Sequence, residues 1–151
     1  MKQSTTINYE HYDSLQDLPA QDYTLIRAAR AAAESSHAPY SHFRVGAAAR
    51  LRSGEIISAA NCESEVFPSG MCAERSLIYF HASNHPGDAI EALAIASSPS
   101  ERECYPCGAC RQALLDAEAR QKSPIRILMA SDSTATVVES AEVLLPFTFK
   151  L

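Results

Sequence analysis

The chain has 151 residues, of which 46% are hydrophobic and 21% charged, and its formal net charge is −5. This length and composition are typical of one globular domain with its own core, so they exclude a largely disordered chain. The acidic balance and the lack of an apolar run of about 18 residues predict no duplex nucleic acid partner and no membrane span. The N-terminal residues are polar and lack the apolar stretch of a signal peptide, so we expect a cytoplasmic protein with reduced cysteines.

No repeat, linker or low-complexity tract divides the sequence. We therefore expect residues 1–151 to form a single domain, with residues 1–20 as an N-terminal arm. The pair Ser53-Gly54 is a tight-turn signal between two apolar runs, which predicts a β-hairpin. Tyr79 and Phe80 are expected in the core. The expected elements are helix 22–34, strands 43–52 and 55–60, helix 72–82, strand 89–97, helix 107–120, strands 125–130 and 134–138, and a helical turn at 140–145. Helices that alternate with strands in this order predict an α/β layered sheet.

Three cysteines lie at the starts of two expected helices: Cys72 in one, Cys107 and Cys110 in the other. Because Cys107 and Cys110 are three positions apart, both thiols can face one point. A helix N-terminus also presents unpaired N–H groups and a partial positive charge, and both stabilise thiolates. Three such thiolates predict one Zn²⁺ per chain. With three protein ligands the fourth coordination position stays open, which is the pattern of a catalytic zinc.

Glu74 lies two residues after the first of these cysteines. The three thiolates already complete the protein's usual share of ligands, so Glu74 is better suited to general acid and base catalysis than to metal binding. Arg75 follows it and can offset the excess negative charge of three thiolates around one divalent ion.

Cys104 opens two alternatives, since it extends the cysteine spacing to Cys-x-x-Cys-x-x-Cys. With Cys72 it completes four ligands for an iron–sulfur cluster, or for a closed structural zinc. Both alternatives leave Glu74 without a role, so we favour the open zinc site. Cys62 and Cys104 are then expected to be ordinary thiols.

Further motifs occur in a fixed order along the chain. They are Pro39-Tyr40-Ser41-His42-Phe43, Val45-Gly46-Ala47-Ala48, Asn61-Cys62-Glu63, Pro68-Ser69-Gly70, Cys72 to Arg75, Pro106 to Gln112, and Leu144-Leu145-Pro146 with Phe149. On these motifs, residues 20–151 resemble the small single-domain cytidine deaminases. Zinc deaminases share a ligand-x-Glu segment followed by Pro-Cys-x-x-Cys, in which the Glu is not a ligand. The resemblance implies a three-layer α/β/α sandwich around a mixed sheet of about five strands.

The resemblance also implies roles for substrate-binding and supporting residues. Asn61 and Glu63 match the pair that binds the ribose 3′-hydroxyl. Phe43 matches an aromatic residue beside the base, and Phe149 matches one contributed near the C-terminus. Arg75 matches an arginine that supports the ligand thiolates.

Two departures from the family pattern follow Glu63. Ser64 and Glu65 stand where the family commonly has Asn and a small residue, and Phe67 stands where it commonly has Tyr. In the family this stretch reaches a neighbouring subunit's site, near the 5′-hydroxyl end of the nucleoside. A carboxylate there would repel a 5′-phosphate, so we expect nucleosides to be used and 5′-monophosphates to be rejected.

The expected activity is hydrolytic deamination of cytidine and 2′-deoxycytidine to the uridines and ammonia, in pyrimidine salvage. As the resemblance implies, we expect a homotetramer with sites shared across subunits, with a dimer as the second choice. One alternative substrate is another aminopyrimidine nucleoside, such as a blasticidin-like antibiotic. An alternative of a different class is a non-enzymatic, zinc-stabilised domain.

Overall fold

The hairpin expected around Ser53-Gly54 is the centre of a larger sheet. In the computed structural model, which describes residues 1–151, β2 (Arg44–Leu51) pairs antiparallel with β3 (Ile56–Ala60). Gly54 has a φ of +93°, a conformation that favours glycine and allows the tight turn. The other main elements are β1 (Glu10–Tyr12), α1 (Ala20–Ala33), α2 (Ala73–Asn84), β4 (Ile90–Ser98), α3 (Gly108–Gln121), β5 (Arg126–Ala130) and β6 (Ala135–Val138).

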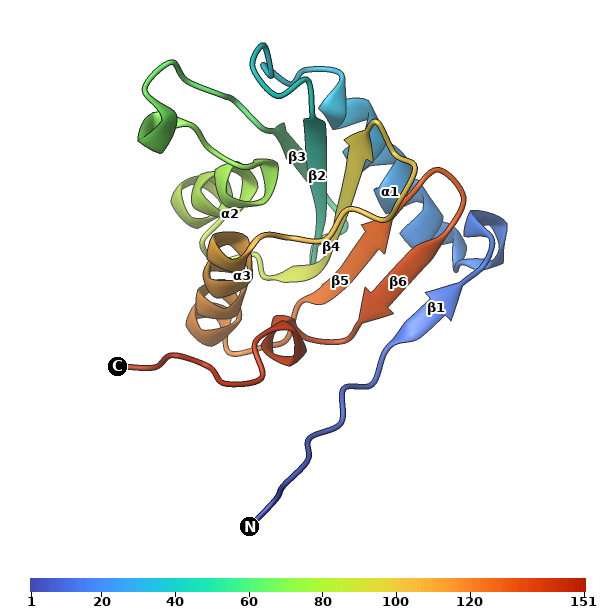
Figure 1. The fold of residues 1–151 in the computed structure, drawn as a ribbon, viewed down its shortest axis with the longest axis vertical. Helices are drawn as coiled ribbons and strands as arrows, with labels where there is room; N and C mark the ends of the chain where they lie inside the picture. Colours follow the sequence, from blue (N-terminus) through green and yellow to red (C-terminus); the bar gives the residue numbers. More distant parts are fainter.

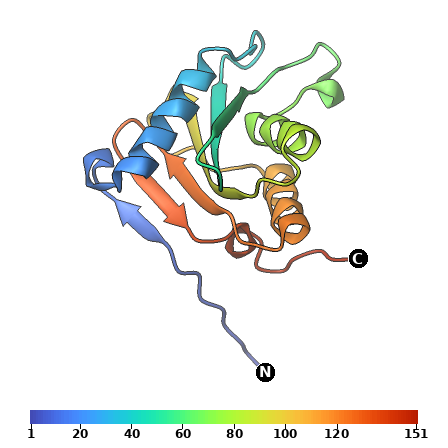
Figure 2. The ribbon, with the colours of Figure 1, turned by 180° about the vertical axis from the view of Figure 1, so that it is seen from behind.

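The six strands form one sheet in the order β1-β6-β5-β4-β2-β3. Only β4 and β5 run parallel, and the other neighbours are antiparallel. Helix α1 covers one face of the sheet, while α2 and α3 lie side by side on the other (Figures 1 and 2). The three-layer α/β/α sandwich is therefore confirmed. The sheet has one strand more than the five expected.

The sixth strand comes from the segment that was expected to be an arm. Residues Glu10–Tyr12 form β1, which pairs with β6 at the edge of the sheet. Leu15 and Leu18, which follow it, are buried in the core beneath α1. Within this N-terminal segment, the residues before β1 extend away from the body of the chain (Figure 1). The burial of these two leucines and the pairing of β1 with β6 hold the rest of the segment on the domain.

The strands present different side chains to the two helical layers. On β4, Leu93 and Ile95 join the larger core cluster under α2 and α3, while Ala92 and Ala94 face α1. Small side chains on the second face let the backbone of α1 approach the sheet closely. The closest approach is at Gly46 on β2, where an added Cβ would lie 1.9 Å from a carbonyl oxygen of α1.

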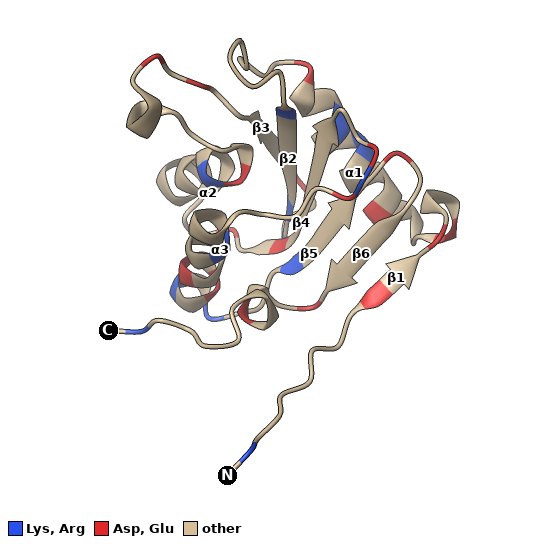
Figure 3. Ribbon diagram, viewed as in Figure 1, with Lys and Arg blue, Asp and Glu red and all other residues tan.

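Two residues expected in the core are on the surface. Tyr79 and Phe80 of α2 are 49% and 46% exposed, because the helix turns its Leu77 and Ile78 toward the sheet. Acidic and basic residues both occur along the helices of the two outer layers (Figure 3). None of the helices combines the length and the apolar character that crossing a bilayer requires.

Candidate active site

The three cysteines singled out by their spacing come together where α2 and α3 begin. Cys72 is the N-cap residue of α2, Cys107 is the N-cap residue of α3, and Cys110 lies in the first turn of α3. The three sulfur atoms lie within 4.8 Å of one another. The Cys72 and Cys107 sulfurs are 3.9 Å apart. The two adjacent helices thus aim three thiols at one point.

This arrangement fits a zinc ion in both chemistry and spacing. Sulfur ligands at about 2.3 Å in tetrahedral geometry are about 3.8 Å apart, close to the distance between Cys72 and Cys107. The group consists of three cysteines, and Cys104 lies outside it. The geometry therefore favours three protein ligands over the two arrangements in which Cys104 is the fourth.

The ionisation of the three cysteine thiols also favours a bound cation. The Cys110 thiol and the Arg75 guanidinium donate toward the Cys72 sulfur and lower the pKa of Cys72 to about 5. The Arg75 Nη2 atom lies 3.3 Å from that sulfur. The hydrogen bond to Cys72 and burial raise the pKa of Cys110 in turn. Since neighbouring thiolates repel each other, a divalent cation among them is what allows all three to ionise.

Glu74 lies in the first turn of α2 and is 4% exposed. Its burial, together with the charge of Cys72, raises the pKa of the Glu74 carboxyl. Glu74 lines a cavity of about 260 Å³ together with Cys72 and Cys107. The same cavity is lined by Phe43, Asn61 and Glu63. All the residues expected to touch base and ribose, except Phe149, therefore share one cavity with Cys72, Cys107 and the carboxylate.

Asn61 follows β3 directly, and its amide is held in one orientation. Its Oδ1 accepts hydrogen bonds from the Val45 N–H, at 2.8 Å, and from the Ser36 hydroxyl. Its Nδ2 donates to the Phe43 carbonyl oxygen at 2.9 Å. Because an amide nitrogen carries two hydrogens, one N–H remains for a ligand.

Glu63 shapes the loop that precedes β2. Its Oε1 accepts hydrogen bonds from the N–H groups of Tyr40, at 3.0 Å, and Ser41, at 3.2 Å. The Ser41 hydroxyl and these backbone donors lower the pKa of Glu63. Oε2 takes part in neither backbone bond, so it can accept a hydrogen bond from another group. The loop bonded to Glu63 leads into Phe43, so these two residues of the cavity are connected.

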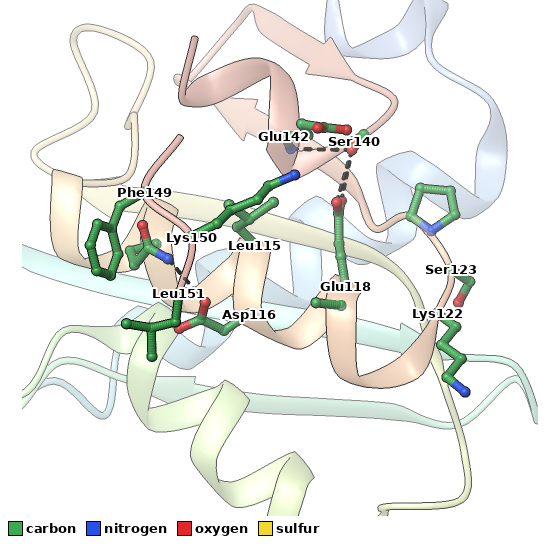
Figure 4. A pocket seen from close by; sticks show the side chains of 13 residues that line it. Leu115, Asp116, Glu118, Lys122, Ser123, Ser140, Glu142, Phe149, Lys150 and Leu151 are labelled. Carbon is green, nitrogen blue, oxygen red and sulfur yellow. Dashed lines mark hydrogen bonds between the residues drawn. The ribbon is translucent and has the colours of Figure 1, made fainter. Parts of the chain in front are cut away.

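Phe149 is not brought to the cysteines within the chain. With Lys150 and Leu151 it lies beside Leu115 and Asp116 of α3, at a cavity of about 820 Å³ (Figure 4). No cysteine lines this cavity. A role for Phe149 beside a base therefore depends on a site in another subunit and stays a prediction.

The segment from Ser64 to Phe67 lies beside the site. Phe67 contacts Tyr40 edge to face, with ring centroids 5.9 Å apart. Both rings, together with Ser64, line a cavity of about 570 Å³ that also contains Cys72 and Arg75. Glu65 is exposed and lines neither this cavity nor the one that holds Glu74.

One residue of the cavity was not found by sequence reasoning. Tyr105 lines it beside Phe43 and Glu74, although it stands just outside the Pro106 to Gln112 motif. The only signal in the sequence is an aromatic residue two positions before Cys107.

Residues 19–123 match the family model described as the cytidine and deoxycytidylate deaminase zinc-binding region. A probable cytidine deaminase of Dictyostelium discoideum is 38% identical over 87 residues, which is 58% of this chain and 58% of that protein, less than two thirds of its length. The crystal structure of cytidine deaminase from Burkholderia pseudomallei superposes with a TM-score of 0.74 at 31% identity, covering 84% of this chain and 98% of that one. A blasticidin-S deaminase of Bacillus cereus is 31% identical over 106 residues, 66% of this chain and 75% of that protein.

Three convergent thiols beside a buried carboxylate, on an α/β/α sandwich, form a site that fits a zinc ion with three protein ligands. The chain belongs to the cytidine and deoxycytidylate deaminase family. Its cofactor is Zn²⁺, for which Cys72, Cys107 and Cys110 are the ligands that the geometry provides.

Proposed function

We propose that the chain is a zinc-dependent hydrolase that converts cytidine and 2′-deoxycytidine, with water, to uridine or 2′-deoxyuridine and ammonia. The observation that carries the proposal is the content of one cavity. It joins two of the cysteine ligands and the buried Glu74 to Asn61 and Glu63. A metal-activated water, a proton carrier and a pair of hydroxyl-binding groups are what hydrolysis of a nucleoside amine requires.

Zn²⁺, when bound by the three cysteines, supplies a Lewis acid that lowers the pKa of a water molecule. Glu74 then has the work of moving protons. Its carboxylate takes one proton from the attacking water and gives it to N3 of the pyrimidine. It then takes the second proton from the same oxygen, now bonded to C4, and delivers it to the 4-amino group, which leaves as ammonia when the C4–N bond breaks. Burial suits Glu74 to this task, because a carboxyl with a raised pKa can release a proton as well as accept one.

The other residues position the substrate. The free N–H of Asn61 and Oε2 of Glu63 hold the ribose 3′-hydroxyl, with one donor and one acceptor. Phe43 is 42% exposed and lines the cavity, so its ring is available to the face of the base. Arg75 keeps the Cys72 thiolate ionised through its bond to the sulfur.

We further propose that the enzyme acts in the cytoplasm, in pyrimidine salvage, and that four chains assemble with sites shared across subunits. The placement of Phe149, which lies away from the cysteines of its own chain, supports this sharing. A site completed by a neighbour gives this exposed ring a place beside a base.

The test is the loss of absorbance near the cytidine band, with ammonia measured in parallel. Cytidine, 2′-deoxycytidine, their 5′-monophosphates and blasticidin S are compared at equal concentration. We expect turnover of the two nucleosides and little of the monophosphates. If only blasticidin S is turned over, the substrate is an aminopyrimidine nucleoside of that kind and not cytidine. Zinc-loaded protein that releases no ammonia from any of them would favour the non-enzymatic domain.

A further inference from the structure

Tyr105 occupies a wall of the cavity that holds Glu74. It lies on the segment between β4 and α3, is 56% exposed, and lines this cavity beside Phe43 and Cys104. The same three residues line an adjoining cavity of about 880 Å³, next to Pro99. Phe43, Cys104 and Tyr105 therefore form the partition between the two spaces.

A buried carboxylate holds Tyr105 in this position. The Tyr105 hydroxyl donates to Oε2 of Glu103 at 2.9 Å. Oε1 of Glu103 accepts a hydrogen bond from the Thr134 hydroxyl at 2.8 Å and lies 3.6 Å from Nδ1 of His11. The Glu103 side chain is 6% exposed. The ring is thus tied, through Glu103, to the turn between β5 and β6 and to β1.

The contacts of Glu103 that hold Tyr105 extend beyond the part of the chain that matches the family model. His11 belongs to β1, and the match begins at residue 19. His11 also lies within hydrogen-bonding distance of the Thr136 hydroxyl, at 3.1 Å, which fixes its ring against β6. The N-terminal strand thereby contributes to the position of a residue at the candidate active site.

On the proposed function, the orientation of the base indicates which edge meets this partition. C4 must face the cysteine cluster, N3 must face Glu74, and N1 carries the ribose toward Asn61 and Glu63. The C2 carbonyl and the C5–C6 edge are left, and of these two the C5–C6 edge is apolar. An aromatic wall is a suitable neighbour for an apolar edge and an unsuitable one for a polar group.

We infer that Tyr105, positioned by Glu103, contacts the C5–C6 edge of the base and determines which C5 substituents the enzyme accepts. The inference rests on the proposed function for the orientation of the base. Removal of the ring would join the cavity of about 260 Å³ to its neighbour and make room for a bulky C5 group. It would also remove an aromatic contact that ordinary cytidine uses.

The experiment compares Tyr105→Ala and Tyr105→Phe with the unaltered, zinc-loaded enzyme on cytidine and 5-iodocytidine. For Tyr105→Ala we expect the KM for cytidine to rise about tenfold, with kcat within about threefold, because aromatic contacts to a base contribute roughly 1–3 kcal/mol. The preference for cytidine over 5-iodocytidine, as a ratio of kcat/KM, should fall about tenfold. Tyr105→Phe keeps the wall, so it should keep the preference and show a smaller rise in KM.

Tyr12→Phe is the matched control. The Tyr12 hydroxyl also donates to a glutamate two residues earlier in the chain, Glu10, at 2.7 Å, but Tyr12 lines none of the cavities at the site. The Tyr12→Phe substitution should leave KM and kcat for cytidine unchanged. An unchanged KM and an unchanged preference in fully zinc-loaded Tyr105→Ala would overturn the inference.

Calorimetric titration with uridine separates this inference from the proposed function. Uridine binding needs no turnover, and Tyr105→Ala should weaken it about tenfold. If the unaltered protein deaminates no cytidine, the proposed function fails, and the titration still decides the role of Tyr105. Equal affinity of the unaltered protein and Tyr105→Ala for uridine, or no uridine binding to either protein, would overturn the inference about Tyr105.

Discussion

The Asn61 side chain makes hydrogen bonds to three segments of the fold and also lines the cavity at the candidate active site. Its amide oxygen joins the loop after α1 to the start of β2, through Ser36 and Val45, and its amide nitrogen holds the Phe43 carbonyl. The side chain that we propose as the N–H donor to the ribose is therefore held in place before any substrate binds. Such preorganisation reduces the free energy that binding must spend on ordering the site.

Glu65 is the residue that we expect to decide between nucleosides and nucleotides. Its side chain is exposed and lines neither cavity beside the cysteines, so we expect its charge to act on a phosphate bound in a neighbouring subunit. Glu65→Ala should leave zinc in place and raise kcat/KM for deoxycytidine monophosphate about tenfold, which corresponds to 1.4 kcal/mol of relieved repulsion. Steady-state assays with both substrates measure the change.

The exposed Glu55, which follows the β2–β3 turn, supplies the control for this prediction. Glu55→Ala removes the same charge elsewhere on the surface and should leave the preference intact. If the unaltered protein already uses the monophosphate as well as the nucleoside, the expected placement of Glu65 is wrong.

The reactive residues of the site were predictable because their roles follow from short spacings. Cys107 and Cys110 are three apart on one helix, and Glu74 is two from Cys72, so local geometry is enough to relate them. Tyr105 was not predictable in this way. Its role depends on Glu103 and on strands that the chain reaches only after folding.

At the scale of elements, the approach of α1 to the sheet depends on Gly46. An added Cβ would lie 1.9 Å from the Ala29 carbonyl oxygen and 2.5 Å from the Ala33 nitrogen, both backbone atoms of the helix. Gly46→Ala must therefore displace α1 from β2, and we expect it to lower the free energy of unfolding by about 3 kcal/mol. Urea denaturation at fixed protein concentration measures this loss.

Gly87→Ala is the matched substitution, since nothing lies within 4 Å of the added Cβ and the residue is outside the helices and strands. It should change the free energy of unfolding by less than about 0.5 kcal/mol. Equal stability of the two variants would show that α1 does not rest on the sheet as described.

Most elements could be predicted from the sequence, because the apolar periodicity of the strands and the Pro and Gly breaks between elements are local signals. β1 could not, since three mostly exposed residues at a sheet edge carry no apolar pattern. Tyr79 and Phe80 were placed wrongly in the core for a related reason. The sequence shows that they are apolar, and only the fold shows that α2 turns them away from the sheet.

At the scale of the whole molecule, several aromatic rings are left on the surface. Tyr79 and Phe80 on α2 are about half exposed, and Phe67, Phe147 and Phe149 are more so. Exposed aromatic residues in such numbers are typical of association surfaces. We predict that light scattering at micromolar protein gives the mass of four chains. The mass of a single chain would contradict the proposed assembly and the sharing of sites.

The central claim is that Glu74 moves protons at a zinc site built from three cysteines. The most direct measurement is the turnover of cytidine by Glu74→Gln, which keeps the volume of the side chain and removes its acid–base function. We predict one zinc per chain by elemental analysis in both the variant and the unaltered protein, with turnover lower by at least about 10²-fold in the variant. Near-normal turnover by a variant with the same zinc content would contradict the claim.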